Sequence, residues 1–119
     1  YLKKMRKEYK NLVRNMWNPF DRNNEKILGC TTVNRLYITP IGDVLVCPYV
    51  HIKIGNIFES SLKEIVDYGF SIKYFRNHSD LCLAGEDKEF IKKFMTKSGQ
   101  TIFKPALAED IFPKEDFVN

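Results

Sequence analysis

Three cysteines are the residues of this chain with the clearest capacity for chemistry. Cys30, Cys47 and Cys82 are spread through the middle of a sequence of 119 residues. A disulfide-stapled secreted domain normally has an even number of cysteines at close spacing, so this pattern argues against one. Two interpretations stay open on spacing alone: buried thiols that serve packing, or thiolates that converge on a metal ion or an iron–sulfur cluster.

A β-hairpin is predicted between the first two cysteines. Residues 35–39 are rich in branched and aromatic side chains, which is typical of a strand, and residues 44–47 predict the returning strand. Residues 40–43, Pro-Ile-Gly-Asp, have the composition of a turn. Pro48 then ends the second strand, because proline cannot donate a hydrogen bond to a sheet.

This hairpin should bring the three thiols together. Since a hairpin places its two ends side by side, we expect Cys30 and Cys47 to lie near each other at the open end. Cys82 follows in a loop, residues 78–85, that can fold back over that end. Neither a short CxxC zinc knuckle nor the paired spacing of a zinc ribbon is present. Convergent thiolates are consistent with either an iron–sulfur cluster or a zinc ion.

Helices are predicted on both sides of the hairpin. Apolar residues recur at spacings of three and four over residues 2–17, which predicts an amphipathic helix. Residues 61–64, Ser-Leu-Lys-Glu, form a capping box that should start a helix reaching about Tyr68, with Gly69 as its stop. Further helical segments are predicted over residues 71–76, 87–97 and 106–111.

The spacing around the hairpin resembles a known family. Cys30, eleven residues, Gly42, four residues and Cys47 are similar to the opening of the SPASM and twitch domains. These are the C-terminal auxiliary-cluster domains of radical S-adenosylmethionine (SAM) enzymes. The Ile-Gly-Asn-Ile segment at residues 54–57 and the capped helix start at residues 61–65 resemble the part of the family pattern that follows.

The resemblance covers roughly residues 28–95 and implies an α+β fold, a small β-hairpin followed by helices. In this interpretation residues 1–27 are a helix and linker, left from or bridging to a partial TIM barrel that this sequence lacks. Residues 28–98 are then the SPASM/twitch-like auxiliary cluster domain, and residues 99–119 are a C-terminal tail. The chain opens without a start methionine, so we expect it to be a fragment or a processed chain.

The resemblance also implies the cofactor. Carried over residue by residue, Cys30, Cys47 and Cys82 become ligands of one [4Fe–4S] cluster. A full SPASM domain has seven cysteines, with a CxxC group at the third position, but this chain has Gly85 where the second cysteine of that group would stand. We therefore expect a reduced, one-cluster, twitch-like form, with a second [4Fe–4S] cluster only in the full-length enzyme.

A [4Fe–4S] cluster takes four ligands, and cysteine supplies only three here. The candidates near Cys82 for the fourth are His78, Asp80, Glu86 and Asp87. Each also has a structural interpretation: Asp87 as a helix N-cap, Glu86 as a favourable charge in the first turn, and His78 as an ordinary histidine. The fourth position can also be left to substrate or solvent, or to a residue absent from this sequence.

Two side chains close to the second cysteine are weaker candidates. Tyr49 and His51 follow Cys47 directly and could face a substrate pocket near the cluster. The alternative is that both pack on the hairpin. No Ser–His–Asp signature, phosphate loop or paired-carboxylate motif accompanies them.

The resemblance implies a function that this sequence cannot perform alone. The CxxxCxxC motif that binds the radical SAM cluster is absent, so no catalytic residue is predicted here. The expected role is to bind an auxiliary cluster and position substrate in a radical SAM oxidoreductase or maturase. S-adenosyl-L-methionine would then bind only the full-length enzyme. The expected partners are the missing barrel and a peptide or small polar substrate, in the cytoplasm, with no nucleic acid and no membrane.

Composition and charge leave two other classes open. With 44% hydrophobic and 13% aromatic residues the chain should fold, and no apolar stretch is long enough for a transmembrane helix. The net charge is +4, and cations gather in residues 1–14, which suits either a binding surface or the solvated face of a helix. The alternatives are thus a metal-free interaction domain with a basic helix, or a zinc-stabilised module in which His78 joins the three cysteines.

Overall fold

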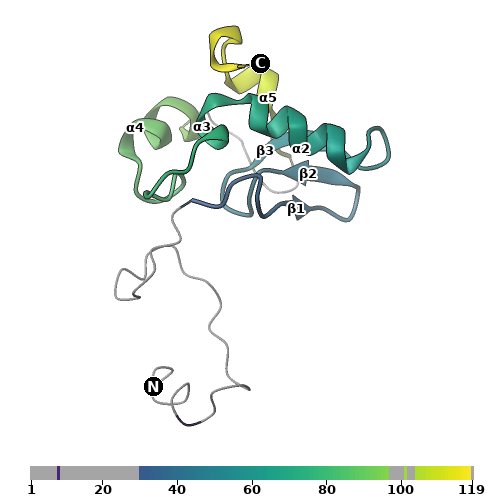
Figure 1. Ribbon diagram of the computed structural model, residues 1–119, viewed down its shortest axis with the longest axis horizontal. Coiled ribbons are helices and arrows are strands. Elements are labelled where there is room, and N and C mark those ends of the chain that lie inside the picture. The colour runs from purple at the N-terminus through teal and green to yellow at the C-terminus, as the bar shows by residue number, and fades with distance from the viewer. Residues whose placement is uncertain (1–7, 9–29, 97–100, 102–103, 119) are drawn as a thin grey trace.

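Figure 1 shows the computed structural model of the chain, which describes residues 8, 30–96, 101 and 104–118. The helix predicted over residues 2–17 lies outside the described residues except for Glu8. The described residues have the predicted α+β fold, with a small four-stranded sheet followed by helices. Among them, no helix is long and apolar enough to cross a membrane.

The sheet has the strand order β1-β2-β3-β4, and the predicted hairpin is its first half. β1 pairs antiparallel with β2 and β2 antiparallel with β3, whereas β4 joins β3 in parallel. This fourth strand was not predicted, because residues 106–111 were expected to form only a helical turn. The strands are β1 Tyr37–Ile38, β2 Asp43–Leu45, β3 Ile52–Asn56 and β4 Ala106–Leu107.

The β1–β2 turn depends on its glycine. Gly42 has a φ of 84°, a backbone conformation that glycine adopts without the steric cost of a Cβ. Its N–H donates to the Thr39 carbonyl at 2.9 Å, and the N–H of Asp43 donates to the Thr39 hydroxyl at 3.1 Å. A Cβ at position 42 would also lie 2.6 Å from the ring of Phe58. The turn therefore requires glycine both for its backbone angle and for space.

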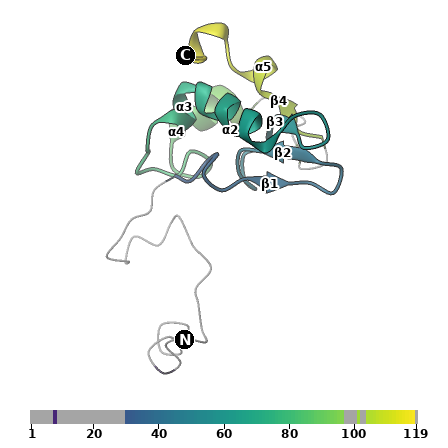
Figure 2. The same cartoon turned by 45° about the vertical axis from the view of Figure 1, so that its right-hand side comes forward.

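Helix α2, Leu62–Ser71, begins as predicted and lies across one face of the sheet (Figure 2). The Ser61 N–H donates to the Glu64 carboxylate at 2.9 Å, and the Glu64 N–H donates to the Ser61 hydroxyl at 3.3 Å. These reciprocal bonds satisfy two backbone donors at the helix start. The predicted capping box is thus confirmed.

The predicted end of α2 is wrong, since the helix passes through Gly69 and ends at Ser71. Gly69 is buried, and a Cβ there would lie 2.9 Å from Ile54 of β3 and 3.0 Å from Val33. The missing side chain therefore lets the helix approach the sheet closely. Glycine serves packing at this position and does not serve as a helix stop.

The later helical segments are short and close around aromatic side chains. The helix predicted over residues 87–97 starts at the predicted cap, because the Asp87 carboxylate accepts a hydrogen bond from the Phe90 N–H at 2.9 Å. After Phe90 it continues as a π-helix that ends at Met95. The segments are α3 Lys73–Arg76, α4 Lys88–Phe90, the π-helix Ile91–Met95, α5 Ala108–Ile111 and a 3₁₀ turn Lys114–Asp116.

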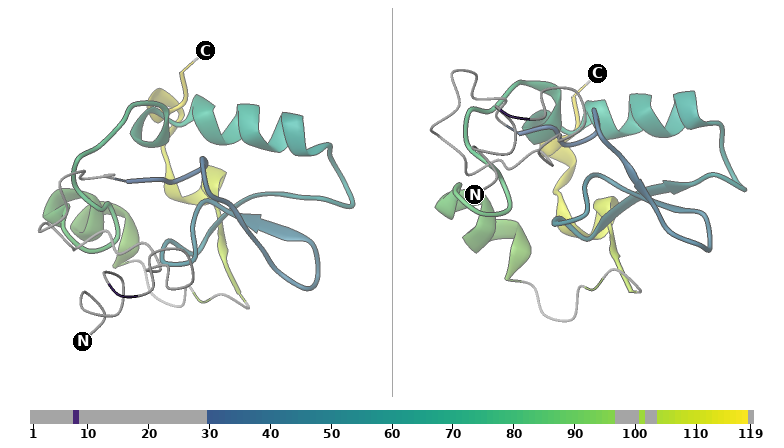
Figure 3. Two further views of the ribbon diagram at one scale, coloured as in Figure 1. Left: turned by 60° about the horizontal axis from the view of Figure 1, so that its bottom comes forward. Right: turned by 90° about the horizontal axis from the view of Figure 1, so that it is seen from below.

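One hydrophobic core joins the sheet to these helices. Val44, Ile52 and Ile54 from the sheet pack with Ile65 of α2, and all four are buried. Figure 3 shows α4 beside the end of the sheet that lies away from the β1–β2 turn. The core continues there as a cluster of rings with centroids 4.7–6.4 Å apart: Tyr74, Phe75, Phe90, Phe94 and Phe112.

Candidate metal centre

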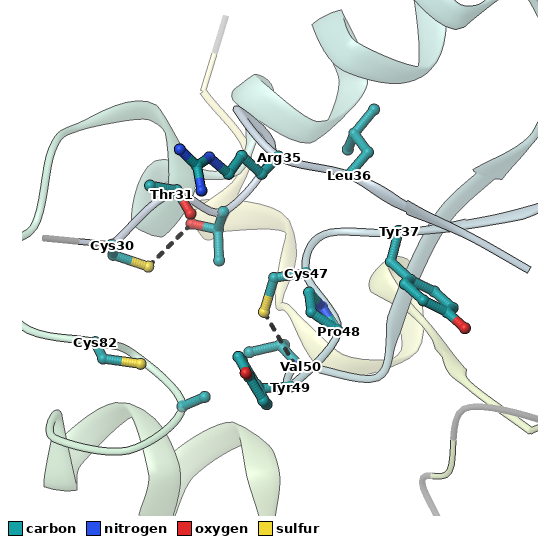
Figure 4. A pocket seen from close by; sticks show the side chains of 12 residues that line it. Cys30, Thr31, Arg35, Leu36, Tyr37, Cys47, Pro48, Tyr49, Val50 and Cys82 are labelled. Atoms are coloured by element: carbon teal, nitrogen blue, oxygen red, sulfur yellow. Dashed lines mark hydrogen bonds between the residues drawn. The ribbon is translucent and has the colours of Figure 1, made fainter. Parts of the chain in front are cut away.

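The structure brings all three thiols to one cavity of about 290 Å³ (Figure 4). Cys30 comes from the segment before β1, Cys47 from the segment after β2, and Cys82 from the loop before α4. The cysteines are 17 and 35 positions apart in the sequence, so only the fold makes them neighbours. None of them is in a disulfide bond.

Backbone hydrogen bonds hold the segment that carries Cys30 against the two segments that carry the other cysteines. The Cys30 N–H donates to the Ser79 carbonyl at 2.7 Å, which ties this segment to the loop that carries the third cysteine. The Val33 N–H donates to the Val46 carbonyl at 2.9 Å, next to the second cysteine. Val33 has a φ of 65°, which is uncommon for a β-branched residue and indicates a strained bend. The bend places Cys30 between the two segments that carry the other thiols.

Cys47 lies in a tight turn that directs backbone N–H groups at its sulfur. The Val50 N–H donates to the Cys47 Sγ at 3.2 Å. Burial raises the pKa of the Cys47 thiol to about 11, although hydrogen bonds from the N–H groups of Tyr49 and Val50 lower it and the neighbouring thiols raise it further. A thiolate in this place therefore needs a positively charged group beside it, which a metal ion or cluster supplies.

Cys82 is buried at the start of a compact turn. Its carbonyl accepts hydrogen bonds from the N–H groups of Glu86 at 2.8 Å and Asp87 at 3.1 Å. Burial raises the pKa of the Cys82 thiol, and backbone hydrogen bonds from Ala84 and Gly85 to the thiol oppose this. The turn therefore presents a second desolvated sulfur, with backbone donors beside it.

The four side chains considered as a fourth ligand make other contacts. His78 Nε2 lies 3.2 Å from the Asp80 carboxylate in an exposed pair. The Glu86 carboxylate accepts a hydrogen bond from the Cys82 N–H at 2.9 Å, and that of Asp87 caps α4. As far as the described residues define the cavity wall, none of these four lines it. Their role as ligands stays a prediction.

The space between the thiols suits a group of several atoms. Among the described residues, no three His, Cys, Asp or Glu side chains gather tightly enough to bind a single metal ion. Zinc ligands lie about 2.0–2.3 Å from the metal and therefore close to one another. Each thiolate of a [4Fe–4S] cluster binds a different iron atom, so the sulfurs stand further apart. A cavity of about 290 Å³ lined by separated thiols fits a cluster better than an ion.

Several residues that the sequence did not point to share this cavity. Thr31, Thr32, Arg35 and Tyr37 line it from the segment that follows the first cysteine, together with the predicted Tyr49. Figure 4 shows the side chains of Tyr37, Pro48 and Tyr49 on the wall formed by the hairpin. The only available signal was their nearness in sequence to Cys30 and Cys47, which does not fix a side-chain direction.

His51 has a different place from the one considered for it. Its Nε2 lies 3.2 Å from the Pro48 carbonyl oxygen, and the residue is not part of the described cavity wall. Tyr49 lines the cavity and is 56% exposed, so its ring borders both the thiols and solvent. Of the two side chains, Tyr49 is therefore the one that can touch a molecule bound at the cavity mouth.

Comparison with known proteins gives one match. Residues 30–86 match the family model of SPASM, the iron–sulfur cluster-binding domain. No curated protein and no solved structure matches the chain. The matched segment begins at Cys30 and includes Cys47, Cys82 and every described residue of the cavity wall. Residues 30–86 of this chain therefore form a SPASM-type iron–sulfur cluster-binding domain.

Proposed function

We propose that this domain holds one [4Fe–4S] cluster through Cys30, Cys47 and Cys82, as an auxiliary centre of a radical SAM enzyme. The observation that supports the proposal is the convergence of these three cysteines on one cavity within the matched segment. The sulfurs of Cys47 and Cys82 are desolvated and receive backbone hydrogen bonds, which is the environment that iron–sulfur proteins provide for their ligands. When bound, the cluster supplies a one-electron carrier.

We further propose that the cavity mouth positions a substrate beside the cluster. Arg35, Tyr37 and Tyr49 line the cavity along with the thiols, and they offer a cation and two phenol hydroxyls. Such groups bind carboxylates, amides and other polar groups of a peptide or a small polar molecule. The barrel that would generate the radical belongs to a part of the enzyme outside this sequence, in keeping with the absent CxxxCxxC motif.

The experiment that tests the cluster site is anaerobic reconstitution of the chain with ferrous iron and sulfide. We expect bound iron and sulfide in equal amounts, with the brown colour of an iron–sulfur protein. Serine at position 30, 47 or 82 should each cause loss of most of the iron, because an alcohol is a poor ligand for iron in such clusters. A wild-type chain that stays colourless and takes up neither iron nor sulfide would contradict the proposal.

The control variant is Asp67→Asn on α2, a position that was not considered as a ligand. Its side chain is 62% exposed and lies outside the described cavity wall, so iron and sulfide should stay at wild-type levels. Loss of iron in this variant to the extent seen with the cysteine variants would show that the cavity lacks the ligand set proposed here.

A further inference from the structure

The three cysteine sulfurs differ in the kind of hydrogen bond that they receive. Cys47 Sγ accepts one from the backbone N–H of Val50 at 3.2 Å, and Cys82 receives its hydrogen bonds from backbone groups too. Cys30 Sγ lies 3.4 Å from the hydroxyl oxygen of Thr32, a side-chain group. The dashed line at Cys30 in Figure 4 marks this contact. Among the described hydrogen bonds to sulfur, the one at Cys30 comes from a side chain, so a single substitution at Thr32 can remove it without altering a backbone donor.

The Thr32 hydroxyl is held at the sulfur by a fixed segment. Thr32 is only 5% exposed, so solvent competes little for its hydroxyl. Backbone hydrogen bonds anchor the residues on both sides of it. The Thr31 carbonyl accepts a hydrogen bond from the Arg35 N–H at 2.9 Å, and the Val33 N–H donates to the Val46 carbonyl at 2.9 Å. A buried hydroxyl on an anchored backbone loses little entropy when it forms the hydrogen bond.

The direction of this hydrogen bond follows from the state of the sulfur. Either atom can donate while Cys30 is a thiol. A thiolate that binds iron has no proton, so the hydroxyl must then be the donor. A donor withdraws electron density from the sulfur and stabilises the reduced cluster, which carries one more negative charge, more than the oxidised one.

We propose that Thr32 sets the reduction potential of the cluster through its hydrogen bond to Cys30, making the cluster easier to reduce. This inference rests on the proposed function, because it needs the cluster at Cys30. Thr32 acts through the ligand and is a positioning residue. It gives this domain a way to adjust its potential without a change of ligand.

The test compares Thr32→Val with Thr32→Ser in the anaerobically reconstituted chain. Valine is close in shape and lacks the hydroxyl, whereas serine keeps it. The cluster is titrated against redox dyes and followed by absorption and electron paramagnetic resonance. We expect valine to raise the ratio of oxidised to reduced cluster at a fixed potential about tenfold, which is a shift of about 59 mV to lower potential for a one-electron couple. The reduction potential of the Thr32→Ser variant should stay near that of the wild type.

The control is Thr96→Val, since Thr96 lies outside the described cavity wall and its hydroxyl donates to the Lys92 carbonyl. Its potential should equal that of the wild type. If Thr32→Val does not fold, Thr32→Ala is compared with Thr32→Ser in its place. Equal potentials in the hydroxyl-bearing and hydroxyl-free variants, each loaded with iron and sulfide, would overturn the inference. Failure of the wild type to take up a cluster would instead count against the proposed function, and the two failures are separated by the iron and sulfide content.

Discussion

Replacement of Gly69 by alanine should destabilise the domain, although alanine is the better helix former. Gly69 lies within α2, where an added Cβ would be 2.9 Å from Ile54 Cδ1 and 3.0 Å from both methyl groups of Val33. Both neighbours are almost fully buried, at 4% and 3% exposure, so neither can swing into solvent. The methyl group must therefore push α2 away from the sheet or displace the bend at Val33.

Two effects of opposite sign decide the magnitude. Alanine in place of glycine inside a helix stabilises by about 1 kcal/mol. Overpacking of a well-filled core typically costs about 1–3 kcal/mol. Because three close contacts to buried branched side chains arise at once, we expect a value in the upper part of that range. The net loss is then about 1–2 kcal/mol, and each kcal/mol lowers the unfolding temperature of a domain this size by about 4–8 °C.

The assay is thermal unfolding of the metal-free chain, followed by circular dichroism. The control is Asp67→Ala on the exposed side of α2, which removes a solvent-screened ion pair with Lys63 and should leave the unfolding midpoint close to that of the wild type. The reconstituted Gly69→Ala chain should also release iron to a chelator faster, because Val33 holds the Cys30 segment. A midpoint for Gly69→Ala equal to or above the wild type would refute the close contact between α2, Val33 and Ile54.

Two ion pairs give further predictions. Burial opposes ionisation of Asp43, but hydrogen bonds from Lys53 and Asn56 outweigh it and hold its pKa below 3.8. Asp43→Asn should therefore cost about 1.5–3 kcal/mol above pH 5. The difference from the wild type should shrink progressively as the pH falls below 3.8 and through the lower pKa of the folded state, because protonation then removes the ion pair from the wild type as well. A difference that is as large at pH 2 as at pH 5 in urea unfolding would contradict this. Lys73 forms an ion pair with Asp116, which is 1% exposed, so Lys73→Met should lower the unfolding midpoint in the same assay, because it leaves a buried carboxylate without its cation. An unchanged midpoint would show that the pair contributes nothing.

The elements that local chemistry specifies could be predicted from the sequence. The capping box at Ser61 and the N-cap at Asp87 depend on residues within one helical turn, and both are present. The β1–β2 hairpin likewise depends on the composition of a few residues around Gly42. Each of these features is stabilised mainly by neighbours in the sequence, which explains why pattern alone was sufficient.

Features that arise from distant contacts could not be predicted in this way. Gly69 was expected to end α2, but contacts with Val33 and Ile54 make it an interior packing position. β4 pairs with β3 across some fifty residues, as in the register Ile52 to Ala106. Nothing in a two-residue strand identifies its partner, so the parallel edge of the sheet is visible only in three dimensions.

In the site, too, some features could be predicted from the sequence and others depend on the three-dimensional fold. The thiols were expected to meet because a hairpin joins its ends, and all three line one cavity. The hydroxyl of Thr32 at Cys30 and the place of Arg35 on the cavity wall depend on side-chain direction along a strained bend at Val33. A φ of 65° at a valine has no sequence signature, so these neighbours of the thiols could not be assigned beforehand.

The most direct test of the central proposal is the Mössbauer spectrum of the chain reconstituted anaerobically with ⁵⁷Fe and sulfide, together with its iron and sulfide content. A [4Fe–4S] cluster at Cys30, Cys47 and Cys82 predicts about four iron atoms and four sulfides per chain, with the spectrum of that cluster type. The spectrum should disappear when all three cysteines are replaced by serine. Iron bound without sulfide, or an unchanged spectrum in the triple variant, would contradict a cluster held by these three thiolates.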